Sequence, residues 1–478
     1  MKRFRDGLIA VVKRECPTCA LIAPVLRQLA AGGEKFTVYS QDDPKFPPEL
    51  EGVVDDRSLE ASFHLDIHTV PTLIRIRGGE ERARAIGWNR AEWEATSGVR
   101  GLGPGLPEHR PGCGSLTDAP GMSYRLTAQF GDAGLESRRI ELDAYADPIE
   151  ACFERGWSDG LPVTPPTPER VLAMLAGTRR APNEVLGLIP PDLVECTVEK
   201  VAVNAVMAGC RPEYMPVVLA ALEAALMPDF GLHGVLCTTN AVAPVIMVSG
   251  PIARSIGMNS KGNVFGQGNR ANATIGRALQ LIVRNVGGGR PGEIDRACFG
   301  NPGKYTFCFA EDVEDSGWES YAAEKGFSRD ASTVTLFTGD GVTPIIDQVS
   351  RSPEELIRSY VPSLRAIYNA GQVADVAAFL VVGPEHARIF YRAGWPKQQL
   401  KDALHQALRV PVRELKPGFG LDHEIERLRR EDPDATLPKF KTGSLNIIRA
   451  GGSAGLFSAI ISGLGSITIN PVTREIPS

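Results

Sequence analysis

The chain has 478 residues, 43% of them hydrophobic, which exceeds the usual size of one domain and can fill large buried cores. Its formal net charge is −5, with acidic and basic residues interspersed, so neither nucleic acid nor an anionic membrane is an expected partner. Nine cysteines, an odd number in a long chain, favour a reducing cytoplasm over a disulfide framework. We therefore expect a cytoplasmic protein of two or three domains.

The apolar stretches of the chain do not predict a signal peptide or a membrane helix. The basic N-terminus is followed by only about five apolar residues, which is too short for a secretory signal. The longest apolar stretch, 235–248, is interrupted by Thr, Asn and Pro and predicts buried strands.

The first chemical feature is the pair Cys16 and Cys19, two residues apart. The apolar segment 8–12 before it predicts a strand, and the apolar segment 20–30 after it predicts a helix. The first thiol then lies at a helix N-terminus, where the macrodipole and free N–H groups lower its pKa. Because the thiolate attacks disulfides, the pair predicts dithiol redox chemistry. Half of a zinc site is the alternative, but no second CxxC or CxxH lies nearby.

A second motif follows about fifty residues later. It is the run from His68 to Glu80, which contains Val70 and Pro71. Together with the CxxC pair and with Pro24, Gly79 and Gly87, this motif resembles the thioredoxin family over residues 1–98.

The thioredoxin resemblance implies roles for three residues. Cys16 would be the exposed nucleophile, Cys19 the resolving thiol, and Pro71 a cis-proline that faces the cysteines and docks the substrate. The cofactor it implies is the redox-active disulfide itself. Two positions depart from the family: Glu15 replaces its usual Trp, and Ala10 replaces its buried acidic residue, which suggests a site tuned to one dedicated partner.

Residues 99–145 are interpreted as a Gly/Pro-rich linker. Cys113 lies within it between Gly112 and Gly114, so its backbone is open to a reacting partner. We expect either an incidental loop thiol or a relay that passes electrons, or a covalently held substrate, between the dithiol and the larger domain.

Residues 146–478 alternate helical and strand-like segments, as in an α/β or α+β domain that could be bilobed. No repeat is visible. The expected helices are 197–208, 217–226 and 271–285, and the expected strands are 242–248, 333–337 and 377–382.

Two polar loops of this domain are candidate ligand sites. The loop 156–167 offers Asp159 and Thr164, although an ordered structural loop is the more expected role. The loop 259–277 is rich in Gly and Asn and enters a helix, which favours an anion or a polar substrate. Its candidate binding residues are Asn263, Arg270 and Asn272.

The segment 298–312 predicts a turn followed by a strand. Lys304 and Cys308 would share one face of this strand and Tyr305 the other. Lys304 and Tyr305 are candidate substrate contacts and Cys308 a candidate catalytic thiol, with a small core residue as the alternative for Cys308.

Two further candidates follow apolar strands. Glu385 and His386 come directly after the strand at 377–382, a common place for general acid/base or metal chemistry in α/β proteins. Ser453 lies in a Gly-x-Ser-x-Gly pattern between an expected strand at 445–448 and an expected helix at 456–461. No His follows His423, so we expect an anion pocket there and not a serine-hydrolase triad.

Four further motifs lie in this region, in the segments 154–162, 270–277, 302–305 and 471–476. They resemble motifs of a poorly characterised bacterial group. Its members carry a thioredoxin-like domain or accompany proteins with a UGSC selenocysteine or cysteine motif. The resemblance covers about residues 110–478 and implies thiol or selenol redox metabolism of a small molecule.

The expected function is a thiol-dependent oxidoreductase or redox-assisted lyase. Its N-terminal dithiol domain would serve a C-terminal α/β domain that binds a small polar or anionic substrate, with a thiol or disulfide reductant as partner. The alternatives are a metal-assisted, non-redox enzyme that uses Glu385 and His386, and a carrier of soft metals or thiol compounds. A metal and a homo-oligomer both remain open.

Overall fold

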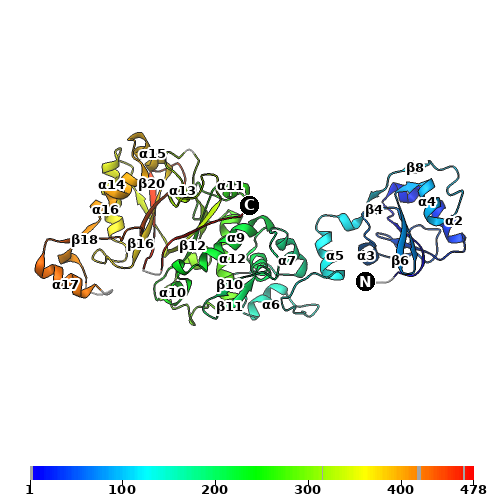
Figure 1. The fold of residues 1–478 in the computed structure, drawn as a ribbon, viewed down its shortest axis with the longest axis horizontal. Helices are drawn as coiled ribbons and strands as arrows, with labels where there is room; N and C mark the ends of the chain where they lie inside the picture. Colours follow the sequence, from blue (N-terminus) through cyan, green and yellow to red (C-terminus); the bar gives the residue numbers. More distant parts are fainter. Residues whose placement is uncertain (1–3, 315, 417–420, 467–468, 478) are drawn as a thin grey trace. The chain divides into compact units, whose positions relative to one another are not determined.

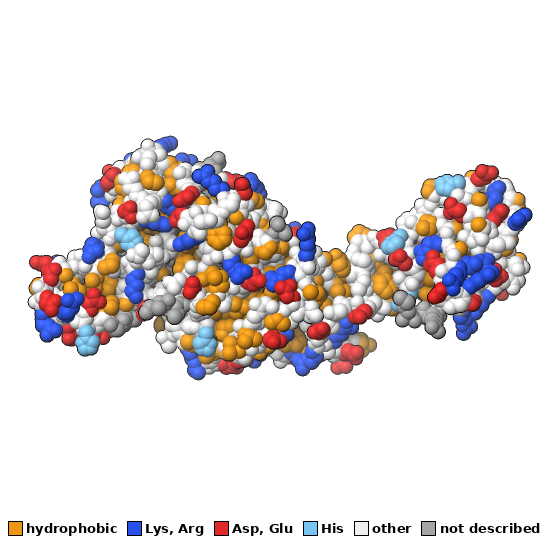
Figure 2. Space-filling model, viewed as in Figure 1, with side chains coloured by type: hydrophobic (Ala, Val, Ile, Leu, Met, Phe, Trp, Pro, Cys, Tyr) orange, Lys and Arg blue, Asp and Glu red, His pale blue; other side chains and the backbone are white. Residues whose placement is uncertain are grey.

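In the computed structural model, residues 4–314, 316–416, 421–466 and 469–477 are described. The chain mixes helices and strands throughout, which confirms the α/β class, and it divides into two compact units (Figure 1). Unit 1 comprises Met1–Gly134 and Pro168–Ala173, and unit 2 comprises Leu135–Thr167 and Met174–Ser478. Basic and acidic side chains are intermixed on the visible face of both units (Figure 2).

Unit 1 is built on a five-stranded sheet in the order β3-β2-β1-β5-β6. β1 pairs in parallel with β2 and antiparallel with β5, and all six of its residues are buried. The strands are β1 (Gly7–Val12), β2 (Phe36–Ser40), β3 (Val54–Asp55), β4 (Thr69–Val70), β5 (Thr72–Arg77), β6 (Glu80–Ile86), β7 (Trp88–Asn89), β8 (His109–Arg110) and β9 (Cys113–Gly114). The helices are α1 (Pro17–Leu21), α2 (Ala23–Ala31), α3 (Glu60–His64), α4 (Arg90–Ser97), η1 (Leu116–Asp118) and α5 (Met122–Phe130).

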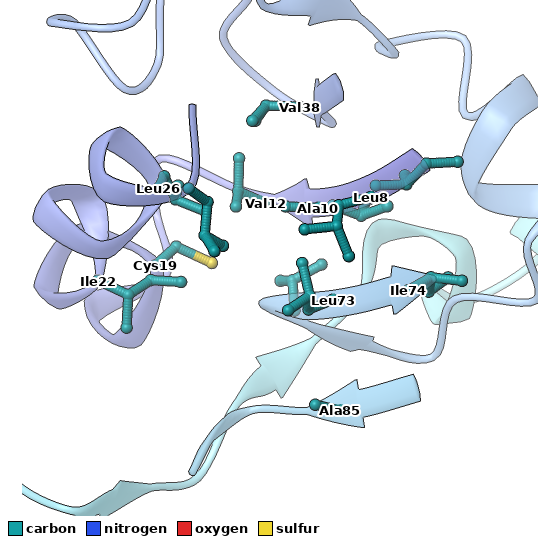
Figure 3. Close-up of a cluster of buried hydrophobic side chains, with 14 of the residues drawn as sticks. Leu8, Ala10, Val12, Cys19, Ile22, Leu26, Val38, Leu73, Ile74 and Ala85 are labelled. Atoms are coloured by element: carbon teal, nitrogen blue, oxygen red, sulfur yellow. The ribbon is translucent and has the colours of Figure 1, made fainter. Parts of the chain in front are cut away.

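The predicted strand at 8–12 and helix at 20–30 are confirmed, except that the helix is divided into α1 and α2 at Ile22. One apolar cluster joins the sheet to α1 and α2. In Figure 3 the Cys19 side chain points from its helix toward the strands, beside Leu26. The expected linker, 99–145, contains β8, β9, η1 and α5. Of these, β8 pairs with β7, β9 pairs with β4, and η1 is hydrogen-bonded to the carbonyl oxygen of Ile67.

Unit 2 contains two four-stranded sheets, β13-β12-β14-β21 and β15-β20-β16-β19. Its strands are β10 (Val185–Ile189), β11 (Val194–Thr197), β12 (Ala243–Ser249), β13 (Cys308–Ala310), β14 (Thr333–Gly339), β15 (Val342–Ile346), β16 (Val376–Val382), β17 (Arg409–Pro411), β18 (Thr436–Pro438), β19 (Leu445–Arg449), β20 (Phe457–Leu464) and β21 (Val472–Glu475). Its helices are α6 (Pro148–Glu154), α7 (Pro168–Leu175, shared with unit 1), α8 (Val198–Ala208), η2 (Pro212–Tyr214), α9 (Met215–Ala225), η3 (Pro228–Phe230), α10 (Leu232–Cys237), α11 (Pro251–Ser255), α12 (Arg270–Asn285), η4 (Pro302–Lys304), α13 (Tyr321–Glu324), α14 (Pro353–Arg365), α15 (Pro384–Arg392), α16 (Lys397–Ala407), η5 (Val412–Glu414) and α17 (Asp422–Glu431).

The three helices and three strands expected in 146–478 are confirmed within a few residues: α8, α9, α12, β12, β14 and β16. Three expectations are wrong. The stretch 235–248 begins in helix α10, so only its second part is a strand; Lys304 ends η4 and not a strand; and 456–461 belongs to strand β20. In the last case β20 pairs on both sides, with β15 and β16, so tertiary pairing overrides the helix pattern.

The two sheets of unit 2 have the same topology, although no repeat is visible in the sequence. In the first sheet, β12 pairs in parallel with β13, which follows it after helices, and antiparallel with β14. In the second sheet, β16 pairs in the same way with β19 and with β20. The final strands are exchanged, because β15 pairs with β20 and β21 pairs with β14. At the ends of β12 and β16, Ser249 pairs with Thr333 and Val382 pairs with Ser458.

Two apolar clusters in the core of unit 2 involve its four-stranded sheets. Apolar side chains of β12, β14, β16 and β19 pack between the sheets, where the Phe337 and Phe379 rings stack at 3.7 Å. A second cluster joins β16, β19 and β20 to α14, α15 and α16. Among the described residues, no single helix has the length and composition to cross a membrane, although the bent pair Pro212–Ala225 and Pro228–Cys237 meets both criteria jointly.

Candidate dithiol site

Cys16 lies where the chain leaves β1 and enters α1. It is the N-cap of α1, with extended backbone, and its sulfur accepts a hydrogen bond from the Cys19 N–H at 3.3 Å. A hydrogen bond with the Cys19 side chain is the main reason that the pKa of Cys16 falls to about 5, against the opposing effect of burial. Backbone donors of Thr18 and Cys19 lower the pKa further. The local structure therefore favours a thiolate at Cys16.

Cys19 has the opposite environment one helical turn later. Its side chain is fully buried among the apolar residues of unit 1, and burial is the main cause that raises its pKa. Ala10, also fully buried, belongs to the same cluster and has no polar atom in its side chain. The Lys13 N–H donates to the Cys19 sulfur at 3.5 Å. The environment of Cys16 thus favours an attacking thiolate, whereas that of Cys19 favours a protonated thiol.

The peptide bond between Val70 and Pro71 is cis, and it lies beside the first cysteine. In its protonated form, the Cys16 thiol donates to the Val70 carbonyl oxygen at 3.4 Å, across 54 residues of sequence. Glu15, which stands where thioredoxins usually have Trp, has an exposed side chain, and its backbone N–H donates to Asp42 at 3.0 Å.

The edge strand β4 is covered by β9. The two pair antiparallel, with Val70 opposite Cys113 and Thr69 opposite Gly114. The Cys16 and Cys113 side chains share a hydrogen bond, which lowers the pKa of Cys16 and raises that of Cys113, where burial is the larger cause. A third thiol therefore lies at the dithiol, and the CxxC pattern does not reveal it.

Several contacts fix the segment around Cys113. The Thr18 hydroxyl donates to the Pro111 carbonyl at 2.7 Å, and the Lys13 ammonium donates to the Gly114 carbonyl at 3.0 Å. The Ser115 N–H donates to the His68 carbonyl at 3.0 Å. Gln41, buried below, donates to the Ser115 hydroxyl at 2.7 Å. Sequence inspection singled out Cys113 but not Thr18, Lys13 or Gln41, since nothing in their spacing relates them to position 113.

Of the candidate acid/base residues of unit 2, His386 is fully buried and Glu385 is half-buried. His386, fully buried on α15, is bonded at both ring nitrogens: Nδ1 to the Ser458 hydroxyl at 2.8 Å and Nε2 to the Asp347 carbonyl at 3.0 Å. Since a carbonyl only accepts, Nε2 carries a proton, and in the neutral ring Nδ1 accepts from Ser458. Glu385 accepts from the Leu456 N–H at 2.7 Å. Both residues therefore connect α15 to β20 and its preceding loop.

Cys308 and Lys304 do not share a face. Cys308 is buried on β13, and burial raises its pKa strongly. Lys304 ends η4, and its ammonium bonds both carboxylate oxygens of Asp295 at 2.6 and 2.7 Å. Tyr305 is partly exposed. Because Cys308 is buried and Lys304 is paired with Asp295, Cys308 is a core thiol.

The residues of the Gly/Asn-rich loop mainly shape the loop itself. Arg270, at the start of α12, donates to the Gly209 carbonyl at 2.9 Å. Asn272 is buried, accepting from the Asn259 N–H at 3.0 Å and donating to the Asn259 carbonyl at 2.9 Å. Asn263 has a left-handed backbone, φ 57°, and donates to the Gln267 carbonyl at 2.8 Å.

The loop 156–167 is tied to α12 by an ion pair. Asp159 accepts from Arg277 at 2.7 and 2.8 Å, and these bonds outweigh burial to hold the pKa of Asp159 below its usual value. Ser453 is exposed between β19 and β20.

A pocket of about 280 Å³ lies at the carboxyl ends of the parallel strands β16 and β19. The loop after α11, in the other repeat, contributes to its wall. Asn263 is the predicted binding residue that lines it. The complete lining is Asn263, Val264, Phe265, Gly266, Pro344, Val381, Gly383, Ala450, Gly451, Gly452, Phe457, Ser458 and Ala459. Ligands of α/β proteins commonly bind at this end of a sheet.

The matching end of β12 and β13 is filled by charged side chains. Glu311, fully buried, accepts from the Ser249 hydroxyl at 2.6 Å and from the Tyr321 N–H at 2.9 Å. Asp312 next to it accepts from Lys261 at 2.7 Å and pairs with Arg449 at 3.1 Å. One repeat therefore retains a pocket where the other has a packed ionic cluster.

Within the described ranges, no group of three or more His, Cys, Asp or Glu side chains is arranged to hold a metal ion. No protein-family model matches the chain, and no curated protein matches it either.

Proposed function

We propose that the protein is a thiol-disulfide oxidoreductase whose nucleophile is Cys16. The observation that carries this proposal is the contrast between neighbouring thiols: the pKa of Cys16 is lowered to about 5 at a helix start, while that of buried Cys19 is raised. The five-stranded sheet and the CxxC at the β1–α1 junction support a thioredoxin-like role for this part of unit 1.

In the proposed reaction, the Cys16 thiolate attacks a substrate disulfide and forms a mixed disulfide, releasing one substrate thiolate. A second protein thiol then attacks the Cys16 sulfur and loses its proton, and the second substrate thiolate leaves. The substrate disulfide is reduced by two electrons and the protein dithiol is oxidised. An external thiol or disulfide reductant returns the protein to the dithiol state.

The test is reduction of insulin disulfides by the full chain with dithiothreitol as reductant. We expect Cys16→Ser to lose the catalysed rate, while Cys298→Ser, at an exposed cysteine of unit 2, retains it. Equal rates for the wild type and Cys16→Ser would contradict the proposal.

We propose in addition that unit 2 binds a small substrate in the pocket at the ends of β16 and β19. Its size, and the backbone groups of four glycines beside apolar walls, support a small molecule with one polar end. Ala459→Leu would fill this pocket. Thermal unfolding with a set of small carboxylic acids, thiols and disulfides should show stabilisation of the wild type and not of this variant; equal stabilisation of both would contradict the assignment.

A further inference from the structure

The strand that covers the dithiol comes from the chain itself. β9 adds to the exposed edge of β4, opposite the residue that precedes cis-Pro71. Addition of a strand to a free sheet edge is a common way for a protein to bind an extended peptide. Here residues 111–115 occupy that edge, with a cysteine at the position next to Cys16.

The geometry around Cys113 points to an exchange reaction. We propose that Cys113 is a third redox-active thiol, which forms an internal disulfide with Cys16, and that residues 111–115 act as a built-in substrate strand of the dithiol site. This proposal rests on the proposed function only in that Cys16 must be a reactive thiol.

The exchange requires no outside oxidant once the Cys16–Cys19 disulfide exists. The Cys113 thiolate, having lost its proton, attacks the Cys16 sulfur. The Cys16–Cys113 bond forms as the Cys16–Cys19 bond breaks, and Cys19 leaves with the electron pair and takes up a proton. One disulfide and one thiol are present before and after the exchange.

Three contacts hold the attacking strand in place. Thr18 and Lys13 bind its carbonyl oxygens at 2.7 and 3.0 Å, and the backbone pairs Val70 with Cys113. Cys16 is 0% exposed beneath it, so the expectation of an exposed nucleophile is wrong. An external substrate must therefore displace this strand before it reaches Cys16, so the third thiol also controls access.

The strand can be moved by a single methyl group. A Cβ at Gly112 would lie 2.8 Å from the Val70 carbonyl oxygen and closer still to the Thr69 side chain. A Cβ at Gly114, two residues away, would meet nothing within 4 Å. Gly112→Ala and Gly114→Ala thus form a matched pair, of which the first alone should displace β9.

The first experiment oxidises the full-length Cys19→Ser variant with oxidised glutathione and maps its disulfides by mass spectrometry. We expect the Cys16–Cys113 disulfide to predominate. Glutathione retained on Cys16 beside a free Cys113 would overturn the proposal. If the internal disulfide forms but the wild type does not reduce insulin, the proposed function fails and this inference stands.

The second experiment introduces each glycine substitution into the Cys19→Ser chain. Gly112→Ala should lower the fraction of Cys16–Cys113 disulfide about tenfold, because overpacking opposes docking of the strand, and should speed alkylation of Cys16 by iodoacetamide. Gly114→Ala should change neither quantity. The same disulfide fraction in both variants would overturn the assignment of β9 as the substrate strand.

Discussion

The cysteines of unit 1 and unit 2 have different surroundings although both groups are largely buried. Cys16 is the N-cap of α1 and receives hydrogen bonds that lower its pKa to about 5. Cys308 is on a strand, where burial raises its pKa. Cys210 is affected in the same direction, since burial raises its pKa to about 12. Burial by itself keeps a thiol protonated, and donors at a helix start reverse that effect.

The comparison extends to the other titratable candidates. Unit 1 brings together three thiols from segments far apart in the sequence. Unit 2 uses His386 and Glu311 to bond neighbouring core elements. The hydrogen-bond partners thus distinguish Cys16, which we propose to be reactive, from His386, whose two ring nitrogens are both bonded.

Replacement of a cysteine in each unit tests the comparison most severely. Cys16→Ser should reduce insulin-disulfide turnover by about a thousandfold or more, because no other group replaces the attacking thiolate. Cys308→Ala should leave the turnover unchanged. A similar loss in both variants would show that the proposed division of roles is wrong.

Replacement of the buried histidine should affect stability and not redox turnover. His386→Ala leaves the Ser458 hydroxyl without its acceptor and opens a cavity, so the free energy of unfolding should fall by about 2–4 kcal/mol in urea titrations. His423→Ala, at an exposed position, is the control and should have little effect. Loss of turnover in a folded His386→Ala protein would instead give unit 2 a chemical role in the dithiol reaction.

The pH dependence of thiolate absorbance at 240 nm sharpens the contrast. The difference in absorbance between the wild type and Cys16→Ser should change with a midpoint near pH 5, whereas an ordinary thiol has a midpoint near about 8.5. Because the folded pKa is lowered, the stability from this thiolate is fully present above the unfolded pKa and is lost as the pH falls through 5. A midpoint above about 8 would contradict the activation of Cys16.

The smallest effect is expected at a partly exposed lysine. Lys13→Met removes the ammonium that binds the Gly114 carbonyl. In the Cys19→Ser background it should lower the fraction of Cys16–Cys113 disulfide about two- to fivefold, the amount expected for one hydrogen bond. Lys35→Met, at an exposed position, is the control. An unchanged fraction in Lys13→Met would mean that this contact does not hold the strand.

Local patterns predicted several elements correctly. The apolar segments gave β1, α8, α12 and β16 within a few residues, because each has the periodicity and length of its own element. The prediction of a helix at 456–461 was wrong, because pairing of β20 with two neighbours decided its structure. The duplicated topology was not visible, since the order and direction of strand pairing can be shared by segments with little common sequence.

The candidate sites divide in the same way. The spacing of Cys16 and Cys19 between a strand and a helix was sufficient to predict a thiol at a helix start, because that effect arises within one turn of backbone. The approach of Val70 and Cys113 required the folded chain, since 43 residues separate them and backbone pairing of β4 with β9 brings them together. Sequence alone thus determined that Cys16 lies at a helix start, whereas the tertiary structure decided which thiols meet, because long-range packing and hydrogen bonding set those distances.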